Sequence, residues 1–495
     1  HILRRHADIQ DPTFEDVRGY YNGALHPDVL DMSDKAVYKS IFQKGKFAGI
    51  FQFTEAGMQN LSKLAKPNNL VDLSAVTSIF RPGPLSAKVD RLYVKAKNNK
   101  KDISYLNKEI KRVTKETYGQ LIFQEQIAQL AHELGKGISL DEGNKLRKLL
   151  TKKGAEETKV KREKKKIYNK FIAGCKEKGL SNIDGGDLWQ TMEFFSGYGF
   201  NLAHATGYSI ISFQCAWLAH YFPAEWMAAF LDKEPEKRKA KAVNLAKSFG
   251  YKIKRVDINN SGRTWEISKD GKTLIQPLTA IKGLGDKAID QILINRPFRD
   301  VEDFLFNENV VYSKLNKKAL DVLCRSQALN ELVDDRFTGL KSFWSAIGVD
   351  RPRTKKELNK NIDLYKEEGD FSLSEKICYI SDLTGVYPLE LVLKEDMLDK
   401  FAKLKIPALG DWDGKLKIAW FIPKEVIVKE TKHGKTYWIL RVIDSTSKEN
   451  DIKCWGIRPL SDKISLNKPY IAKLEHNDKW GFSSRSLKHN FKLLT

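Results

Sequence analysis

The stretch that decides the fold reads Ser196-Gly-Tyr-Gly-Phe-Asn-Leu-Ala-His-Ala-Thr-Gly-Tyr208. It places Tyr198, His204 and Tyr208 within thirteen residues that also hold three glycines. Glycine lets the backbone turn sharply and approach a ligand closely. Two aromatic rings and a histidine provide a flat surface for a base and a donor for a phosphate. The stretch therefore predicts a ligand-contacting turn, although a histidine in a helical region is more often structural.

The segments on either side of this turn have helical periodicity. Trp189, Met192 and Phe195 would share one face of a helix that precedes the turn. The apolar stretch 209–231 follows it, but polar residues and Pro223 interrupt that stretch, which makes it a buried helix pair and not a membrane span. We expect residues from about 60 to 233 to be mostly helical.

Basic residues gather upstream of the turn. An apolar helix over 71–80 should end at the corner Arg81-Pro-Gly-Pro84, since proline and glycine cannot continue it. Further along, the stretch 145–170 holds twelve Lys or Arg and three Glu. Each of these cations alone could belong to a solvated helix face, but the cluster together with Arg81 favours an anionic ligand.

Composition supports a polyanionic partner. The 495 residues contain 85 Lys plus Arg against 63 Asp plus Glu, a net charge of +22. A merely basic soluble protein is the alternative. With 41% hydrophobic residues the chain can bury several cores, so we expect three or four domains. The five cysteines are far apart and form no CxxC, which argues against a disulfide framework and a zinc site.

Several motifs in this chain resemble those of the C-family replicative DNA polymerases of bacteria, the alpha subunits of DNA polymerase III. The glycine-rich stretch resembles the S/A-G-Y-G-F-N-K-S-H-x-x-x-Y motif of their fingers, and residues 50–58 resemble V-F-Q-x-E-S-x-G-M. Residues 116–126 resemble E-x-T-Y-G-x-x-x-Y-Q-E-Q, and the corner at 81–84 matches R-P-G-P. Residues 256–259, Val-Asp-Ile-Asn, resemble P-D-I-N.

The resemblance implies a site for an incoming deoxynucleoside triphosphate, whose about four negative charges need several cations. Its candidate contacts come from the corner, the basic helix 144–153 and the glycine-rich stretch: Arg81, Arg147, Lys148, Tyr198, His204 and Tyr208. The family motif on the basic helix is L-L-R-R-A-M-G-K-K-K, and it implies DNA contacts at Lys152 and Lys153. Lys148 stands where the family has a second Arg, and Leu202-Ala203 stands where it has Lys-Ser. Gln124 and Gln126 could contact a base or join helices in the core.

A second candidate site lies in the stretch 278–289, which fits a helix-hairpin-helix. Gly283 and Gly285 would let backbone N–H groups face a DNA phosphate, with Lys282 and Lys287 adding attraction. Such a contact positions DNA but reads no sequence. The second hairpin, 315–329, has Ser-Gln-Ala in place of a glycine turn, so we interpret it as mainly structural.

The C-terminal region changes to strand-like periodicity. Stretches 418–428 and 436–442 are rich in β-formers and are joined by Lys432-His-Gly-Lys435. Together with the resemblance this predicts an OB fold, a five-stranded barrel that binds single strands. Lys432, Lys435 and Trp438 are the candidate DNA contacts, with Tyr437 beside them. If Tyr437 and Trp438 alternate across the barrel wall, one of them belongs to the core.

The carboxylate pairs needed for two-metal nucleotidyl transfer are not found in a plausible place. Asp411-Trp-Asp413 has the D-x-D spacing but reads as a turn before the strands. We therefore predict no catalytic residue and no metal ligand in this chain. The resemblance implies that Mg²⁺ is held by a palm on another polypeptide, as in a split or truncated polymerase, a form that a bacterial virus could encode.

The fold class that we predict is multidomain: mostly α fingers with tandem helix-hairpin-helix motifs, then a small β-barrel OB fold. The expected parts are a lead-in from the palm side (1–60), fingers (61–233), outer fingers with the hairpins (234–345), a linker with connecting helices (346–414) and the OB fold (415–495). The expected partners are primer–template DNA, dNTP and a palm-bearing polymerase half, in the bacterial cytoplasm at the nucleoid or a phage replication site, with no membrane contact. A sliding clamp is a further candidate, although no Q-x-L-F pentapeptide is evident. The alternatives are a stand-alone DNA-binding accessory protein of replication or repair and a repair nuclease subunit.

Overall fold

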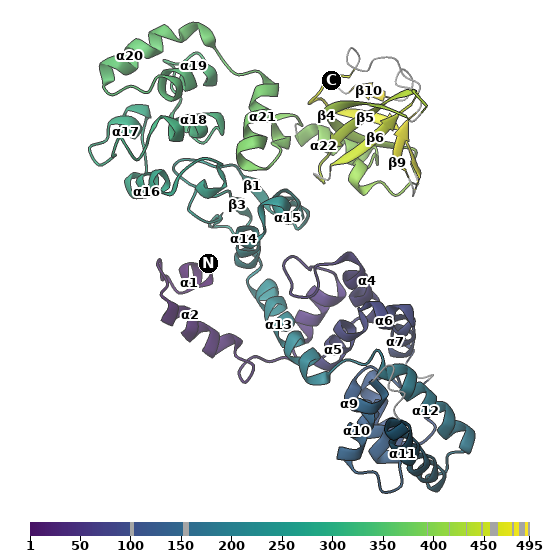
Figure 1. Cartoon of the computed structure of the whole chain (residues 1–495). Helices are drawn as coiled ribbons and strands as arrows, with labels where there is room; N and C mark the ends of the chain where they lie inside the picture. The colour runs from purple at the N-terminus through teal and green to yellow at the C-terminus, as the bar shows by residue number, and fades with distance from the viewer. Residues whose placement is uncertain are drawn as a thin grey trace. The chain divides into compact units, whose positions relative to one another are not determined.

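The computed structural model describes residues 1–99, 103–151, 158–393, 395–414, 416–431, 433–446, 449–455, 464–477, 480–484 and 491–493. The chain divides into two compact units, residues 1–226 and 227–495 (Figure 1). Within the described residues no helix has the length and apolar character needed to cross a bilayer. All five cysteines are free thiols.

The first unit is helical, as the periodicity predicted. Its helices are α1 (Ile2–His6), α2 (Phe14–Tyr20), α3 (Lys35–Val37), α4 (Ala56–Ala65), α5 (Leu70–Ile79), α6 (Pro82–Ser86), α7 (Val89–Asn98), α8 (Lys108–Thr114), α9 (Gln124–Leu134), α10 (Leu140–Thr151), α11 (Thr158–Glu177), α12 (Asn182–Ser196), α13 (Leu202–Tyr221) and the start of α14 (Pro223–Lys233).

Two helix boundaries follow from local chemistry. The side chain of Asn69 caps α5 by accepting a hydrogen bond from the backbone N–H of Asp72 (2.8 Å). Helix α5 ends at Ile79, and Pro82 then occupies the first turn of α6, where its missing N–H costs nothing. The corner that starts at Arg81 thus joins two helices.

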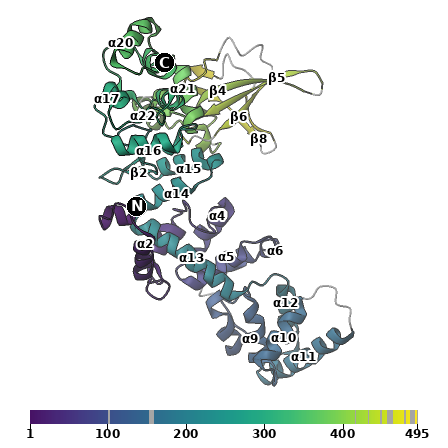
Figure 2. The same ribbon diagram turned by 60° about the vertical axis from the view of Figure 1, so that its left-hand side comes forward.

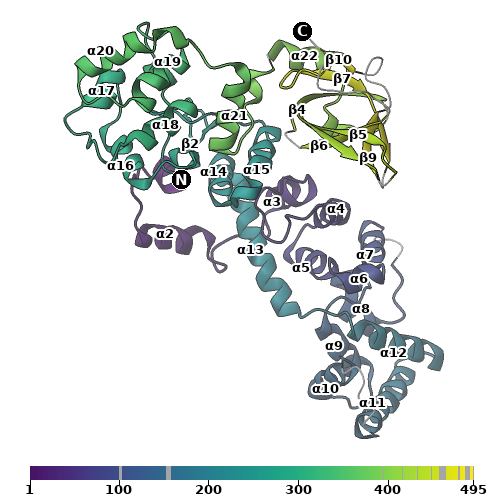
Figure 3. The same cartoon turned by 45° about the horizontal axis from the view of Figure 1, so that its top comes forward.

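Two apolar cores hold the first unit together. One core includes Tyr38, Phe42, Phe53 and Phe213, all fully buried. The other lies among α9, α10, α11 and α12, which form a bundle of their own (Figure 3), and it contains the face of α12 predicted from the sequence: Trp189, Met192 and Phe195. The last turn of α12 therefore enters the glycine-rich stretch from a firmly packed helix.

The second unit begins with helices and a small sheet. Its described helices are α15 (Glu236–Ser248), α16 (Asp286–Asn295), α17 (Val301–Phe306), α18 (Lys317–Arg325), α19 (Leu340–Trp344), α20 (Lys355–Leu364), α21 (Leu373–Thr384) and α22 (Glu395–Lys403). Strands β1 (Lys252–Lys254), β3 (Thr273–Ile275) and β2 (Glu266–Ile267) form a sheet in that order. Within 346–414, where a linker with connecting helices was expected, Leu358 of α20 is fully buried in the same core as Leu320 and Phe343.

The remaining strands form one curled sheet consistent with an OB fold. They are β4 (Ile418–Glu430), β5 (Thr436–Ile443), β6 (Asn450–Cys454), β7 (Tyr470–Lys473), β8 (Glu475–Asn477), β9 (Gly481–Ser484) and β10 (Phe491–Leu493). Their order is β10-β7-β4-β5-β6-β9-β8. The described part of the sheet thus has seven strands where five were expected, and it forms a half-barrel around a core that includes Phe421, Leu440 and Ile452.

The hairpin of β4 and β5 is longer than its neighbours. Strand β7 pairs with β4 only from Ile418 to Phe421, and β6 pairs with β5 only from Trp438 to Val442. Beyond those residues the two long strands pair with each other alone, so the hairpin projects from the sheet (Figure 2). At its end the side chains of Val428, Lys429 and Glu430 are exposed.

Candidate nucleotide site and nucleic-acid interface

The glycine-rich stretch forms a turn between two helices. Helix α12 ends at Ser196 and α13 begins at Leu202, and the side-chain oxygen of Asn201 caps α13 by accepting a hydrogen bond from the backbone N–H of His204 (2.8 Å). His204 and Tyr208 lie one helical turn apart with ring centroids separated by 4.3 Å. Both side chains are exposed, so they present a joint aromatic surface to solvent.

The Arg-Pro-Gly-Pro corner packs directly against this turn. The ring of Tyr198 lies so close to Gly83 that a Cβ atom at that position would collide with it. The guanidinium of Arg81, an exposed residue, lies 4.5 Å from the ring centroid of Phe200, a cation–π contact. The ring of Phe200 is in turn 5.3 Å from that of His204. The structure thus brings Arg81 close to Tyr198 and His204, although more than a hundred residues of sequence separate it from both.

The segment before α9 holds the turn in place. The backbone N–H of Gln124 donates to the carbonyl of Phe200 (2.9 Å), and its side-chain amide donates to the carbonyl of Gly199 (2.9 Å). The side-chain oxygen of Gln126 accepts from the N–H groups of Ile122 and Phe123. Both glutamines are therefore engaged in backbone contacts within the protein, the second of the two readings that the sequence allowed.

Glu125 is a residue that the sequence reasoning passed over. Its carboxylate accepts hydrogen bonds from the side chain of Asn201 (2.8 Å) and the backbone N–H of Leu202 (2.9 Å). The same carboxylate lies 3.7 Å from the guanidinium of Arg147. Its place between the two glutamines of the Gln-Glu-Gln motif was the available signal. Glu125 therefore connects the basic helix α10 to the start of α13.

The predicted basic residues differ in their surroundings. Arg147 is half-buried and paired with Glu125, whereas Lys148 is exposed on α10. Successive residues on a helix point about 100° apart, so these two cations cannot face one point equally. Lys152 and Lys153 lie outside the described residues.

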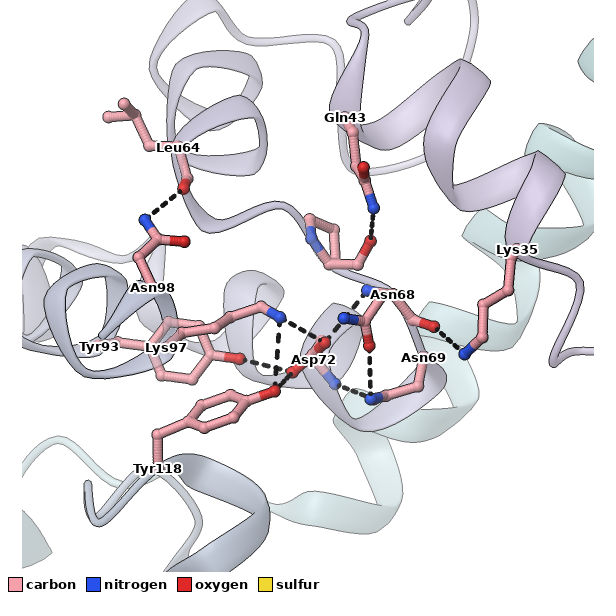
Figure 4. Close-up of polar contacts among 11 residues, drawn as sticks. Lys35, Gln43, Leu64, Asn68, Asn69, Asp72, Tyr93, Lys97, Asn98 and Tyr118 are labelled. Atoms are coloured by element: carbon pink, nitrogen blue, oxygen red, sulfur yellow. Dashed lines mark hydrogen bonds and ion pairs between the residues drawn. The ribbon is translucent and has the colours of Figure 1, made fainter. Parts of the chain in front are cut away.

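A buried polar network surrounds the side chain of Asp72 (Figure 4). The carboxylate of Asp72, which is fully buried, accepts from Lys97 Nζ (2.8 Å), the hydroxyls of Tyr93 (3.1 Å) and Tyr118 (2.8 Å) and the backbone N–H of Asn68 (3.1 Å). Burial and the neighbouring Asp72 charge raise the pKa of Tyr93 and Tyr118 above the ordinary phenol value. Both phenols therefore stay protonated and donate to the carboxylate.

The network joins three segments that surround the turn. Asp72 belongs to α5, which leads into Arg81, and Lys97 belongs to α7, which follows the corner. Tyr118 precedes the segment that pairs with Phe200, and its own backbone is held at a positive φ of 53°. A fully satisfied buried network rigidifies the elements that it links. Asp72 thus fixes the corner relative to the glycine-rich turn.

The first hairpin of the second unit has one glycine that the backbone requires. Gly283 adopts a φ of +89°, whereas Gly285 has an ordinary φ of −79° and caps α16. A Cβ atom on Gly285 would meet nothing within 4 Å. The backbone N–H of Lys282 donates to the carbonyl of Leu383, so it is used inside the protein, while the Lys287 side chain is exposed.

Two further details distinguish the hairpins. Lys318, an exposed residue at the start of α18, lies beside Gly283 and was not predicted. In the second hairpin Gln327 takes the positive φ (64°) that a glycine usually takes, and Arg255 donates to its side-chain oxygen (2.8 Å). The turn of the first hairpin is thus exposed, whereas the turn of the second hairpin is buried.

The aromatic residues of β5 face opposite sides of the sheet. Trp438 packs partly against the core of the half-barrel, whereas Tyr437 stacks on Trp455 with a centroid distance of 4.5 Å and an interplanar angle of 18°. The exposed Lys435 precedes them, and Lys432 lies outside the described residues. The alternation considered for the sequence is present, and it makes Tyr437 with Trp455, not Trp438, the outward stacking surface.

No group of three or more His, Cys, Asp or Glu side chains is placed to hold a metal ion in the part of the chain that the structure describes.

Comparisons with known proteins identify two regions of the chain. Residues 9–179 match the bacterial DNA polymerase III alpha subunit finger domain, and residues 250–338 match a helix-hairpin-helix motif. The DNA polymerase III alpha subunits of Campylobacter jejuni and Aquifex aeolicus are each 30% identical, over 75% and 84% of this chain. That of Pseudomonas aeruginosa is 32% identical over 66% of the chain.

The matched regions amount to 32%, 35% and 28% of these three relatives, so the chain spans about a third of their length. The finger match covers the corner, the buried network and α10, and the helix-hairpin-helix match covers the open hairpin at Gly283. Through its finger domain and its helix-hairpin-helix region, the chain belongs to the family of bacterial DNA polymerase III alpha subunits.

Proposed function

We propose that this chain is the fingers and DNA-binding part of a replicative DNA polymerase. It binds the incoming dNTP, the primer–template duplex and the template single strand. The palm, which would hold Mg²⁺ and align the primer 3′ hydroxyl, lies outside this chain. The observation that carries the proposal is the convergence of Arg81, Tyr198 and the His204–Tyr208 pair on one exposed turn.

The chemistry of that turn suits a nucleoside triphosphate. Arg81 is exposed and its guanidinium can pair with phosphate oxygens in a bidentate manner. His204 can donate to a phosphate, and its ring and that of Tyr208 form a surface on which a base or sugar can rest. Arg147 would have to break its ion pair with Glu125 to contact the phosphates, so we assign it to positioning the turn. Lys148, which is exposed, is the cation of α10 that we assign to the nucleotide.

The second unit would hold DNA by its backbone and its bases. The open hairpin at Gly283 and Gly285 offers N–H groups, with Lys287 and Lys318 adding charge beside a phosphate. At the projecting β4–β5 hairpin, the stacked pair Tyr437 and Trp455 can accept unstacked bases at about 1–3 kcal/mol each. Neither contact reads sequence.

A second candidate is a stand-alone DNA-binding accessory protein of replication or repair. The observation in its favour is that the helix-hairpin-helix region and the stacked pair Tyr437 and Trp455 could hold DNA without a nucleotide site. The two candidates differ in the partner: a split polymerase needs a palm-bearing chain, and an accessory protein does not.

The test is primer extension together with native mass spectrometry of the complex isolated from the source cells. The purified chain alone should bind primed DNA but should not extend it. The isolated complex should contain a palm-bearing C-family chain and should extend the primer with Mg²⁺. Arg81→Ala in that complex should raise the KM for dNTP without weakening duplex binding.

Extension by the chain alone would refute the division of labour, and a complex that lacks a palm-bearing chain would favour the accessory protein. Failure of the chain to bind any DNA would exclude both candidates.

A further inference from the structure

The outer face of helix α11 carries four cations in a regular arrangement. Lys161, Arg162, Lys165 and Lys166, here called the basic stripe, are exposed and lie at helical positions i, i+1, i+4 and i+5. Lys161 lies one helical turn from Lys165, as Arg162 does from Lys166, and the four positions together cover an arc of about 140° around the helix. Lys161 and Arg162 lie about 6 Å along the helix axis from Lys165 and Lys166, because four residues of an α-helix rise by about that distance.

Two other cations of α11 have carboxylate partners within the first unit. Lys164 pairs with Glu193 of α12, and Lys170 pairs with Glu142 of α10. Glu163 of α11 itself pairs with Lys145. For the four members of the basic stripe, the described residues offer no such ion pair.

The position of the stripe is unfavourable for the helix itself. Helix α11 begins at Thr158 and has no acidic residue in its first turn, so cations lie close to the positive end of the helix dipole. Lys161 with Lys165, and Arg162 with Lys166, are like-charge pairs four residues apart, which also destabilise a helix. Burial of Ile167, Phe171 and Cys175 holds the helix in place instead. Residues that destabilise their own helix without a compensating contact are typical of functional sites.

We propose that the basic stripe binds the phosphate backbone of duplex DNA, a contact additional to the hairpins and the glycine-rich turn. This site rests on the proposed function of the chain as a DNA-binding polymerase part. The described face of α11 exposes no aromatic ring for stacking, since Tyr168 is half-buried against Trp189. A surface with cations but no stacking rings suits the backbone of a duplex and not the bases of a single strand.

The test is a salt titration of DNA binding by fluorescence anisotropy, with the full chain and a primer–template duplex. The stripe variant carries Lys161→Gln, Arg162→Gln, Lys165→Gln and Lys166→Gln. The matched control carries Lys39→Gln, Lys44→Gln, Arg91→Gln and Lys95→Gln, which removes the same number of exposed charges elsewhere in the first unit. Circular dichroism confirms that both variants are folded.

Each phosphate neutralised on a duplex contributes about 0.9 to the slope of log affinity against log salt concentration. The stripe variant should therefore lose about 2–4 from that slope and bind roughly ten- to a hundredfold more weakly at 50 mM salt. The control should lose less than about 1 from the slope. Binding to a single strand of the same length should change as little in the stripe variant as in the control.

Equal slopes for the stripe variant and the control would overturn the site, and an equal loss on the single strand would overturn its assignment to duplex. These outcomes differ from failure of the proposed function, in which the unmodified chain itself would not bind DNA.

Discussion

The buried pair of Lys97 and Asp72 gives the sharpest stability prediction. The Lys97 side chain is 4% exposed and Asp72 is fully buried, with Nζ 2.8 Å from the carboxylate. Lys97→Met keeps the length and the apolar stem of the side chain but removes the charge. The carboxylate of Asp72 then remains buried with only the two phenols and one backbone N–H as donors.

Removing one partner of a buried ion pair costs about 3–5 kcal/mol, because an uncompensated charge stays in the interior. Adding Asp72→Asn removes that charge while keeping an oxygen that can accept from Tyr93 and Tyr118. The double variant should therefore be more stable than Lys97→Met alone, with a coupling energy above about 1 kcal/mol. Lys95→Met, an exposed neighbour on α7, is the control and should change stability by less than about 0.5 kcal/mol.

Hydrogen exchange followed by mass spectrometry suits this measurement, because the chain has two compact units and global unfolding need not be two-state. Peptides that cover α5 and α7 should lose protection in Lys97→Met and regain part of it in the double variant. The reasoning fails if Lys97→Met behaves like Lys95→Met, or if the second substitution adds its own full cost instead of relieving the first.

Three further outcomes are expected. Gly283→Ala should destabilise the second unit by about 1–2 kcal/mol because of its left-handed backbone, whereas Gly285→Ala should cost less, about 0.5–1 kcal/mol, because alanine is a poorer N-cap of α16 than glycine. Weakened duplex binding in the folded Gly285→Ala protein would then report a direct strand contact, and unchanged binding would argue against one. Gly83→Ala should displace the ring of Tyr198 and raise the KM for dNTP in the palm-containing complex, and an unchanged KM would speak against the nucleotide site. Burial and the charge of Asp72 raise the pKa of Tyr93, so the unfolded chain loses that phenol proton first and stability should fall progressively above about pH 10. The free energy of unfolding should fall less steeply with rising pH in Tyr93→Phe than in the unmodified protein. An identical pH dependence in the two proteins would contradict this.

The sequence by itself determined the features that depend only on residues adjacent in the chain, such as helix ends and strands. The helix end at Arg81, the packed face of α12 and the start of α14 at Pro223 follow from periodicity and from the chemistry of proline and glycine. The strands β4 and β5 follow from their β-branched and aromatic residues. These signals are local, so a single chain suffices to read them.

Only the tertiary structure decided how distant side chains pair. The contact of Gly83 with Tyr198 and the pairing of Glu125 with Arg147 join segments that no periodicity relates. The sequence could say that Tyr437 and Trp438 alternate, but not which of them faces the core, because that depends on the strands that pair with β5. Likewise the polar composition of α20 concealed its buried Leu358, which docks the helix on the core together with the partly buried Ile362.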